Sequence, residues 1–188
     1  MRDEDPRLSR LRELGATVGS SIYLGPEVYF EYDFAELLTI EDGVVLSQGC
    51  TVLLHDSSLN NLVGAPIRFG EVTFAEGAYV GADSLVMCGV RVGRGALVGA
   101  ASLVTADVPD GAVAYGSPAR VHTTVDELVE RTAAVDDPRW FQVPARSWRH
   151  RDADEDQQLL TDIAAAFAAR RGAPGSDRPE TTDQEDRP

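Results

Sequence analysis

The sequence predicts a mainly β fold, a parallel β-helix in which each six-residue unit forms one flat side of a coil and stacks on the units above and below it. Two observations lead to this fold. The first is an apolar residue at every sixth position, a spacing that matches neither the helical period of about 3.6 residues nor the two-residue alternation of a single strand. The second is the glycines between these positions, which suit the turns at the corners of the coil. The six apolar positions are Phe74, Val80, Val86, Val92, Val98 and Val104.

A second row of residues, four places after each of these, supports the same arrangement. Most of its members are small, which suits positions near a corner where little space remains. Because each coil buries its side chains only against its neighbours, several coils must stack before the fold is stable. The row consists of Ala78, Ser84, Val90, Ala96, Ser102 and Val108.

Residues 1–14 predict a short amphipathic helix that caps the open end of the coil. Leu8, Leu11 and Leu14 lie there between charged residues and give the helix one apolar face. The coil domain is expected to follow over residues 15–121.

The period of six breaks twice, and each break predicts an insertion. A shift of four residues in the apolar positions places a bulge or small loop within 31–38. A larger gap, between Val52 and Phe74, contains turn residues without a clean repeat and predicts a loop that leaves the coil over about 57–68. Long loops on rigid scaffolds are often functional, so this second break is the first place to look for a site.

The residues after Val108 predict a turn-rich exit strand, followed by a helical extension over 122–171. Within this extension the sequence favours helices at 125–134 and at 154–171. Residues 172–188 have the composition of a disordered tail.

The composition is that of a globular protein with one ordinary domain, with 188 residues of which 43% are hydrophobic. No apolar run approaches about 20 residues and no basic, apolar leader is present, so we expect no membrane span, no secretory signal and a cytoplasmic location. The net charge of −14 argues against nucleic acid as a partner. Two cysteines, Cys50 and Cys88, are expected to be reduced packing residues.

His55 is the strongest candidate for chemistry among the three histidines. It stands at the end of a coil, directly before the longer predicted loop, where a side chain can reach a cleft. Histidine can accept a proton from a hydroxyl or an amine near neutral pH, which suits a general base. The same position equally suits a hydrogen bond across the base of the loop, so the residue alone leaves both roles open. His122 and His150 lie outside the repeat.

Two motifs occur together in this chain: the pair HD at 55–56 before the loop, and the run VTFAEGAYVGADSLVMCGVRVGRGALVGAASLVTADVPDGAVAYGSPARV at 72–121. They resemble the hexapeptide-repeat acyltransferases, whose left-handed β-helix enzymes transfer acetyl from acetyl-CoA, over roughly residues 15–125. The similarity is greatest to the O-acetyltransferases of sugars and polysaccharides. The resemblance implies a left-handed coil, acetyl-CoA as co-substrate, no required metal, and a homotrimer with active sites between subunits.

The resemblance also implies roles for particular residues. His55 matches the family's general base, which takes the proton of the acceptor as it attacks the thioester directly in a ternary complex. Ala82 and Ala100 match the turn positions, one coil apart, whose backbone holds the pantetheine arm. Tyr79 matches an aromatic residue that lines the acceptor or pantetheine side of the pocket.

At the nucleotide end of CoA the chain departs from the family pattern. Thr105 and Arg120 match residues that meet the nucleotide and its phosphates, but Ala106 stands where a lysine is usual. The loss of one cation predicts weaker CoA binding, for which Arg91 or Arg94 could compensate.

The predicted loop supplies the candidates for the acceptor side. Polar residues near His55 can hydrogen-bond the hydroxyl groups of an acceptor. The candidates are Asp56, Asn60, Asn61 and Arg68.

Three functions remain open from the sequence. The leading hypothesis is an acetyl-CoA-dependent O-acetyltransferase that acts on a hydroxyl of a saccharide or sugar-containing metabolite. An N-acetyltransferase of an amino sugar or antibiotic would use the same base and the same CoA groove. A non-catalytic β-helix that serves as a scaffold or binding subunit is favoured only by Ala106. A γ-class carbonic anhydrase is rejected because it needs three histidines to hold zinc, and only His55 lies on the coils.

Overall fold

The computed structural model describes residues 5–133, 158 and 161–165. The chain divides into two compact units, Met1–Ala133 and Ala134–Pro188, and each is described by itself. In the second unit, residues 161–165 are helical. Residue 158 is helical as well, whereas the other residues of the helix expected at 154–171 and the whole tail at 172–188 lie outside the described residues.

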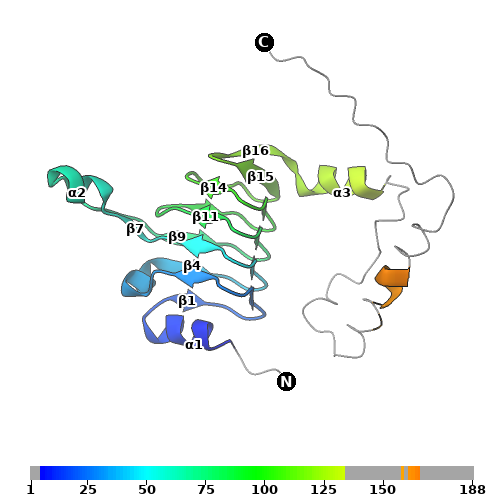
Figure 1. Cartoon of the computed structure of the whole chain (residues 1–188), viewed down its shortest axis with the longest axis horizontal. Helices are drawn as coiled ribbons and strands as arrows, with labels where there is room; N and C mark the ends of the chain where they lie inside the picture. Colours follow the sequence, from blue (N-terminus) through cyan, green and yellow to red (C-terminus); the bar gives the residue numbers. More distant parts are fainter. Residues whose placement is uncertain (1–4, 134–157, 159–160, 166–188) are drawn as a thin grey trace, which may run out of the picture. The chain divides into compact units, whose positions relative to one another are not determined.

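The first unit is a three-sided parallel β-helix, with short strands stacked coil upon coil (Figure 1). The chain visits the three sides in turn, so neighbouring strands of one side belong to successive coils. Side A consists of β1 (Thr17–Val18), β4 (Leu38–Ile40), β9 (Val72–Phe74) and β12 (Arg91–Val92). Side B consists of β2 (Tyr23–Leu24), β5 (Val45–Leu46), β10 (Tyr79–Val80), β13 (Leu97–Val98), β15 (Ala112–Gly116) and β16 (Ala119–Thr124). Side C consists of β3 (Tyr29–Phe30), β6 (Thr51–Val52), β11 (Leu85–Val86) and β14 (Leu103–Val104).

The apolar residues six positions apart fill the interior of the prism, as the sequence predicts. All six of them, from Phe74 to Val104, are fully buried, and the smaller residues that follow them at the corners are buried as well. The parallel register places inward apolar residues of successive coils next to one another: Val80 pairs with Leu46 in the coil before it and with Val98 in the coil after it. This burial and pairing confirm the β-helix.

Glycine is required where successive coils touch at a corner. At Gly81 an added Cβ atom would lie only 2.5 Å from the backbone nitrogen of Ala100 in the next coil. No side chain fits at that separation, so the close stacking of the coils depends on the missing Cβ.

The N-terminal helix is confirmed as α1 (Pro6–Glu13). The side chain of Asp5 accepts a hydrogen bond from the backbone nitrogen of Arg7 at 2.9 Å, which caps the first turn of the helix. Leu8 and Leu11 are buried and belong to the same apolar core as the coils. The helix therefore closes the first coil, which has no coil below it.

Both breaks in the period are insertions at the corner where side C passes to side A, which we call the C–A corner. The first is a 3₁₀ helix, η1 (Tyr32–Leu37), in place of the expected bulge or loop. The second, which we call the arm (residues 55–69), is an antiparallel hairpin rather than a plain loop, and Figure 1 shows it projecting from the prism. Its elements are β7 (His55–Asp56), α2 (Ser58–Val63) and β8 (Arg68–Phe69).

The coil ends in a change of strand direction. β16 runs antiparallel to β15, so the last strand of side B folds back over the preceding one. The helix α3 (Val125–Ala133) follows, with Asp126 and Glu127 in its first turn, as the sequence predicts. Among the helices in the described part of the chain, none is long and apolar enough to cross a membrane.

Phe74 provides a test of the core. Phe74→Ala is expected to lower the free energy of unfolding by about 3–5 kcal/mol, because it removes buried apolar area and leaves a cavity. Phe74→Leu keeps most of the volume and is expected to cost about half as much or less. Urea unfolding followed by circular dichroism, at one fixed protein concentration, measures both values. Equal losses for the two variants would contradict the packing described here.

Candidate active site

His55 lies at the root of the arm, between two phenylalanine rings. The ring of Phe34, from η1, meets the imidazole edge to face with centroids 5.1 Å apart. The ring of Phe69, from β8, stacks on it at 5.7 Å and packs against Phe34 at 4.9 Å. The two insertions at the C–A corner thus come together around this histidine, whose side chain stays 28% exposed.

Glu31 holds the imidazole from the coil below. Its Oε1 is in direct contact with the buried Nδ1 of His55. Its Oε2 accepts hydrogen bonds from the backbone nitrogens of Leu54, at 2.6 Å, and of His55, at 3.1 Å. Sequence reasoning missed this residue. The signal that could have found it is a carboxylate at the end of a coil side, directly before the first break of the period.

The contact with Glu31 leaves Nε2 as the reactive ring nitrogen. Nε2 has no partner among the residues that the structure describes. A histidine with one nitrogen held by a carboxylate and the other free has the arrangement of a general base.

The four polar residues expected on the acceptor side lie on the arm, and each bonds within the protein. Asp56 accepts hydrogen bonds from the hydroxyl and the backbone nitrogen of Ser58, and these bonds hold its pKa below the ordinary value. Three of the four residues bond within the arm, and the bond of Arg68 ties the arm to the next coil. Asp56 accepts from Ser58 at 2.6 Å, Asn60 donates to the Ala65 carbonyl at 2.7 Å, Asn61 donates to Ser57 at 3.2 Å, and Arg68 donates to the Cys88 carbonyl at 3.2 Å.

Ala82 and Ala100 stack on successive coils at the corner between sides B and C, the B–C corner. The backbone nitrogen of Ala101 donates to the carbonyl of Ala82 at 2.8 Å, which ties the two turns together. Tyr79 lies on the outer surface of side B, 43% exposed, and its hydroxyl accepts a hydrogen bond from Ser47 at 3.1 Å.

The residues carried over from the family pattern fall on two edges of the prism. His55 and Thr105 both follow strands of side C, at the C–A corner. Ala82 and Ala100 precede strands of side C, at the B–C corner. Within one chain, the whole width of side C separates the histidine from the two turns.

Arg120 lies on β16, in a patch that the sequence did not reveal. It pairs across the hairpin with Tyr115, which stacks face to face on His122 with ring centroids 3.8 Å apart. Tyr115 lies over Gly99, next to the turn of Ala100. The signal for this patch was absent from the sequence because only the β15–β16 register brings these side chains together.

Arg91 and Arg94, which could compensate for the missing lysine, each pair with a carboxylate. Both lie toward the third corner, between sides A and B, where Arg91 pairs with Asp110 at 2.9 Å and Arg94 pairs with Glu76 at 3.2 Å. The backbone nitrogen of Arg91 also donates to the side chain of Asp107 at 2.8 Å, so this residue is close to the segment that follows Thr105. That either arginine serves the phosphates stays a prediction.

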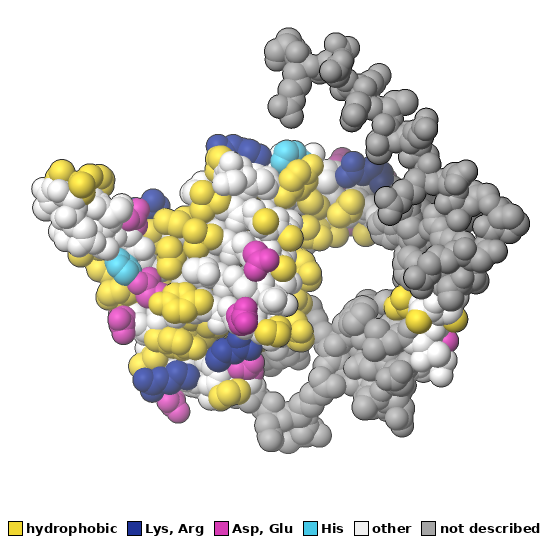
Figure 2. All heavy atoms as spheres, in the orientation of Figure 1, with side chains coloured by type: hydrophobic (Ala, Val, Ile, Leu, Met, Phe, Trp, Pro, Cys, Tyr) yellow, Lys and Arg dark blue, Asp and Glu magenta, His cyan; other side chains and the backbone are white. Residues whose placement is uncertain are grey.

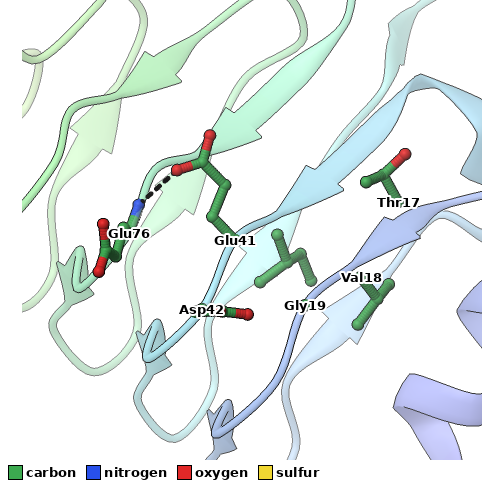
Figure 3. Close-up of a pocket in the computed structure, with 7 residues that line it drawn as sticks. Thr17, Val18, Gly19, Glu41, Asp42 and Glu76 are labelled. Atoms are coloured by element: carbon green, nitrogen blue, oxygen red, sulfur yellow. Dashed lines mark hydrogen bonds between the residues drawn. The ribbon is translucent and has the colours of Figure 1, made fainter.

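An open pocket at the A–B corner contains none of the candidate residues. It is lined by residues 17–19, 40–42 and 76, and Figure 3 shows its three carboxylate side chains. Glu41 accepts a hydrogen bond from the backbone nitrogen of Glu76 at 2.8 Å, and Asp42 accepts one from Ser20 at 2.6 Å. These carboxylates bridge successive coils, so the pocket is part of the scaffold.

No protein-family model matches the chain. Among curated proteins, the galactoside O-acetyltransferase of Escherichia coli (strain K12) is 29% identical over 143 residues, which cover 65% of this chain and 70% of the relative. The dTDP-3-amino-3,6-dideoxy-α-D-galactopyranose 3-N-acetyltransferase of Aneurinibacillus thermoaerophilus is 36% identical over 95 residues, 50% of this chain and 49% of the relative. YvoF of Bacillus subtilis (strain 168), named among acetyltransferases, is 29% identical over 119 residues, 63% of this chain and 64% of the relative. The chain thus spans between half and about two thirds of the length of these relatives.

A solved structure supports the fold. The hexapeptide-repeat-containing acetyltransferase of Vibrio cholerae O1 biovar eltor, solved with acetyl coenzyme A, matches with a TM-score of 0.56 and 20% identity, covering 66% of this chain and 79% of that one. The expected fold class, a left-handed parallel β-helix, is confirmed by this match and by the three stacked sides. The repeat, the fold and the sequence relatives together make the chain similar to the hexapeptide-repeat acetyltransferases.

Proposed function

We propose that the protein transfers acetyl from acetyl-CoA to a hydroxyl group of a saccharide or sugar-containing metabolite. The observation that carries the proposal is the imidazole of His55, held through Nδ1 by Glu31 and open at Nε2. The similarity to a galactoside O-acetyltransferase supports a sugar as acceptor. The two phenylalanines around His55 suit such an acceptor, because the C–H face of a sugar ring packs well on an aromatic surface.

His55 does the proton transfer in this proposal. Nε2 takes the proton of the acceptor hydroxyl while that oxygen attacks the thioester carbonyl carbon. The carbon–sulfur bond then breaks, and the imidazolium gives its proton to the departing sulfur. The products are the acetyl ester and the free thiol of CoA. No covalent bond to the protein forms, which agrees with the burial of Cys50 and Cys88.

The B–C corner is the proposed path of the CoA chain. Small residues at Ala82 and Ala100 let a ligand approach the backbone there, and Tyr79 lies beside them on side B. From the level of β5 to the level of β15 there are three coil steps, or about 14 Å along the axis. An extended pantetheine arm on this path brings the nucleotide to the patch of Tyr115, His122 and Arg120.

A homotrimer would complete the site. Because one side of the prism separates His55 and Thr105 from Ala82 and Ala100, a groove between two copies can join one edge of each. The outward-facing residues of side A are polar, whereas those of sides B and C are mostly aromatic or aliphatic, which suits a contact between copies through sides B and C. Side A shows Thr17, Thr39, Thr73 and Arg91, side B shows Tyr23, Tyr79 and Leu97, and side C shows Tyr29, Thr51, Leu85 and Leu103.

The arm has a place in the same assembly. Its helix α2 buries no residue, and Leu59, Leu62 and Val63 are each more than half exposed at its tip (Figure 2). Apolar side chains gathered on a projecting segment are typical of a contact surface. The arm would lie against the neighbouring copy and close the groove over His55. The need for acetyl-CoA and the two free thiols support a cytoplasmic location in this proposal.

Transfer to an amino group is the second candidate. It is favoured by the sugar 3-N-acetyltransferase, which has the highest identity of the three relatives. The same Nε2 would take the proton of an amine as it attacks the thioester, so an acceptor panel must contain amino sugars as well as hydroxyl acceptors.

Removal of the base is the first test. Purified protein is expected to release free CoA from acetyl-CoA when a suitable sugar acceptor is present, measured as thiol. His55→Asn keeps a donor for Glu31 but cannot act as a base, so kcat is expected to fall by about 10²–10⁴-fold with the melting temperature kept. His55→Ala is expected to lose the same activity. Undiminished CoA release by both variants would end the proposed mechanism.

The nucleotide site is tested by calorimetry with CoA. Arg120→Ala is expected to raise the Kd of CoA about tenfold, because a charge-assisted phosphate contact is lost. Ala106→Lys is expected to lower the Kd several-fold by restoring the usual cation. Pantetheine, which lacks the nucleotide, serves as the control ligand and should bind all three proteins alike. Failure of the unaltered protein to bind CoA at about 1 mM would favour the non-catalytic scaffold.

The cysteines are expected to be unreactive. Both are fully buried, and burial raises the pKa of the Cys50 thiol, so less thiolate is present near neutral pH. Iodoacetamide should label neither residue in the folded protein and both in denaturant, as measured by mass spectrometry. Loss of activity in step with labelling of a cysteine would contradict direct transfer.

A further inference from the structure

We propose that Glu31 is the positioning residue of this site, a single buried carboxylate that both fixes the root of the arm and sets which nitrogen of His55 carries the proton. The inference rests on the proposed function, in which Nε2 of His55 is the base. Glu31 does not touch the reacting atoms and acts only through the histidine.

Oε2 of Glu31 takes the place of the backbone acceptors that the strand ladder no longer provides where the arm begins. Up to Leu53 the chain is part of side C, and the backbone nitrogen of Leu53 still donates to Val86 in the next coil at 3.0 Å. The next two backbone nitrogens, of Leu54 and His55, leave that ladder as the arm begins, and both donate to Oε2 of Glu31. Without this acceptor, two backbone donors at a buried junction would be unsatisfied.

Oε1 of Glu31 determines which nitrogen of the imidazole carries the proton. Backbone N–H groups can only donate, so they hold Oε2 in place and turn Oε1 toward Nδ1 of His55. An ionised carboxylate can only accept, so Nδ1 must carry a proton to satisfy it. In the neutral imidazole the other nitrogen, Nε2, is then the free acceptor that a base needs.

Packing holds the ring in this orientation. Phe34 and Phe69 contact the imidazole, and Phe34 belongs to the 3₁₀ helix that starts directly after Glu31. The carboxylate, the ring and its two aromatic neighbours are thus set by the same two insertions. A half-turn of the imidazole about its Cβ–Cγ bond would exchange Nδ1 with Cδ2 and so move a C–H group against Oε1.

Glu31→Gln separates the two roles of the carboxylate. The amide has the same shape but only one accepting oxygen, which the backbone nitrogens of Leu54 and His55 would retain. Its NH₂ group would then face Nδ1 and donate to it, so the proton of the imidazole would move to Nε2. The arm would keep its place, but Nε2 would carry a proton and could no longer accept one from the acceptor.

The test compares Glu31→Gln with Glu71→Gln, which changes an exposed carboxylate just beyond the arm. We expect Glu31→Gln to lower kcat by about 10³–10⁴-fold, as a wrong tautomer does in a hydrolase triad, with the Kd of CoA within about twofold of the unaltered value. Glu71→Gln should leave kcat within about twofold. Two-bond ¹H–¹⁵N NMR of the imidazole should show His55 protonated at Nδ1 in the unaltered protein and at Nε2 in Glu31→Gln.

The NMR measurement keeps the inference separate from the proposed function. If the protein transfers no acetyl group, the tautomer of His55 still decides the role of Glu31. Protonation at Nε2 in the unaltered protein would overturn the inference, whether or not Glu31→Gln folds. A Glu31→Gln variant with unchanged kcat or an unchanged tautomer would overturn it equally.

Discussion

The stacking of one coil directly on the next is the constraint on which the whole structure depends. Strands of two or three residues have no stability of their own, and each exists because it pairs with strands one coil below and above. The coils approach so closely at the corners that Gly81 has no room for a Cβ atom. Such a ladder fixes the positions of the sides and leaves freedom only at the corners, where the chain can depart and return without breaking it.

The regular part of the fold could be predicted because one rule governs it. An inward residue every six positions identifies the interior, and Phe74 through Val104 lie there as expected. The insertions follow no such rule. Phe34 fits the corner position of its repeat by count, yet it lies in a 3₁₀ helix and packs on His55. The predicted loop proved to be a hairpin with its own helix, because nothing in a period of six describes a segment outside the coils.

The candidate site was predictable only in part for a related reason. His55 could be found because it stands at a break in the period. Glu31 could not, because its partners lie 23 and 24 residues further along the chain and meet it only when successive coils stack. The pairing of Tyr115 with Arg120 depends likewise on the antiparallel register of the last two strands. The ion pairs of Arg91 with Asp110 and of Arg94 with Glu76 were also not predictable, because they form only when successive coils stack.

The arm leaves and rejoins the prism at a single corner, where the hairpin pairing of His55 with Phe69 brings its two ends together. Closing a longer segment at that point costs little extra free energy, since the entropy of loop closure grows only slowly with length. The prism needs nothing from the arm beyond its root. The arm is therefore an exchangeable module: its length and tip can change while the carboxylate, the histidine and the stacked coils stay as they are.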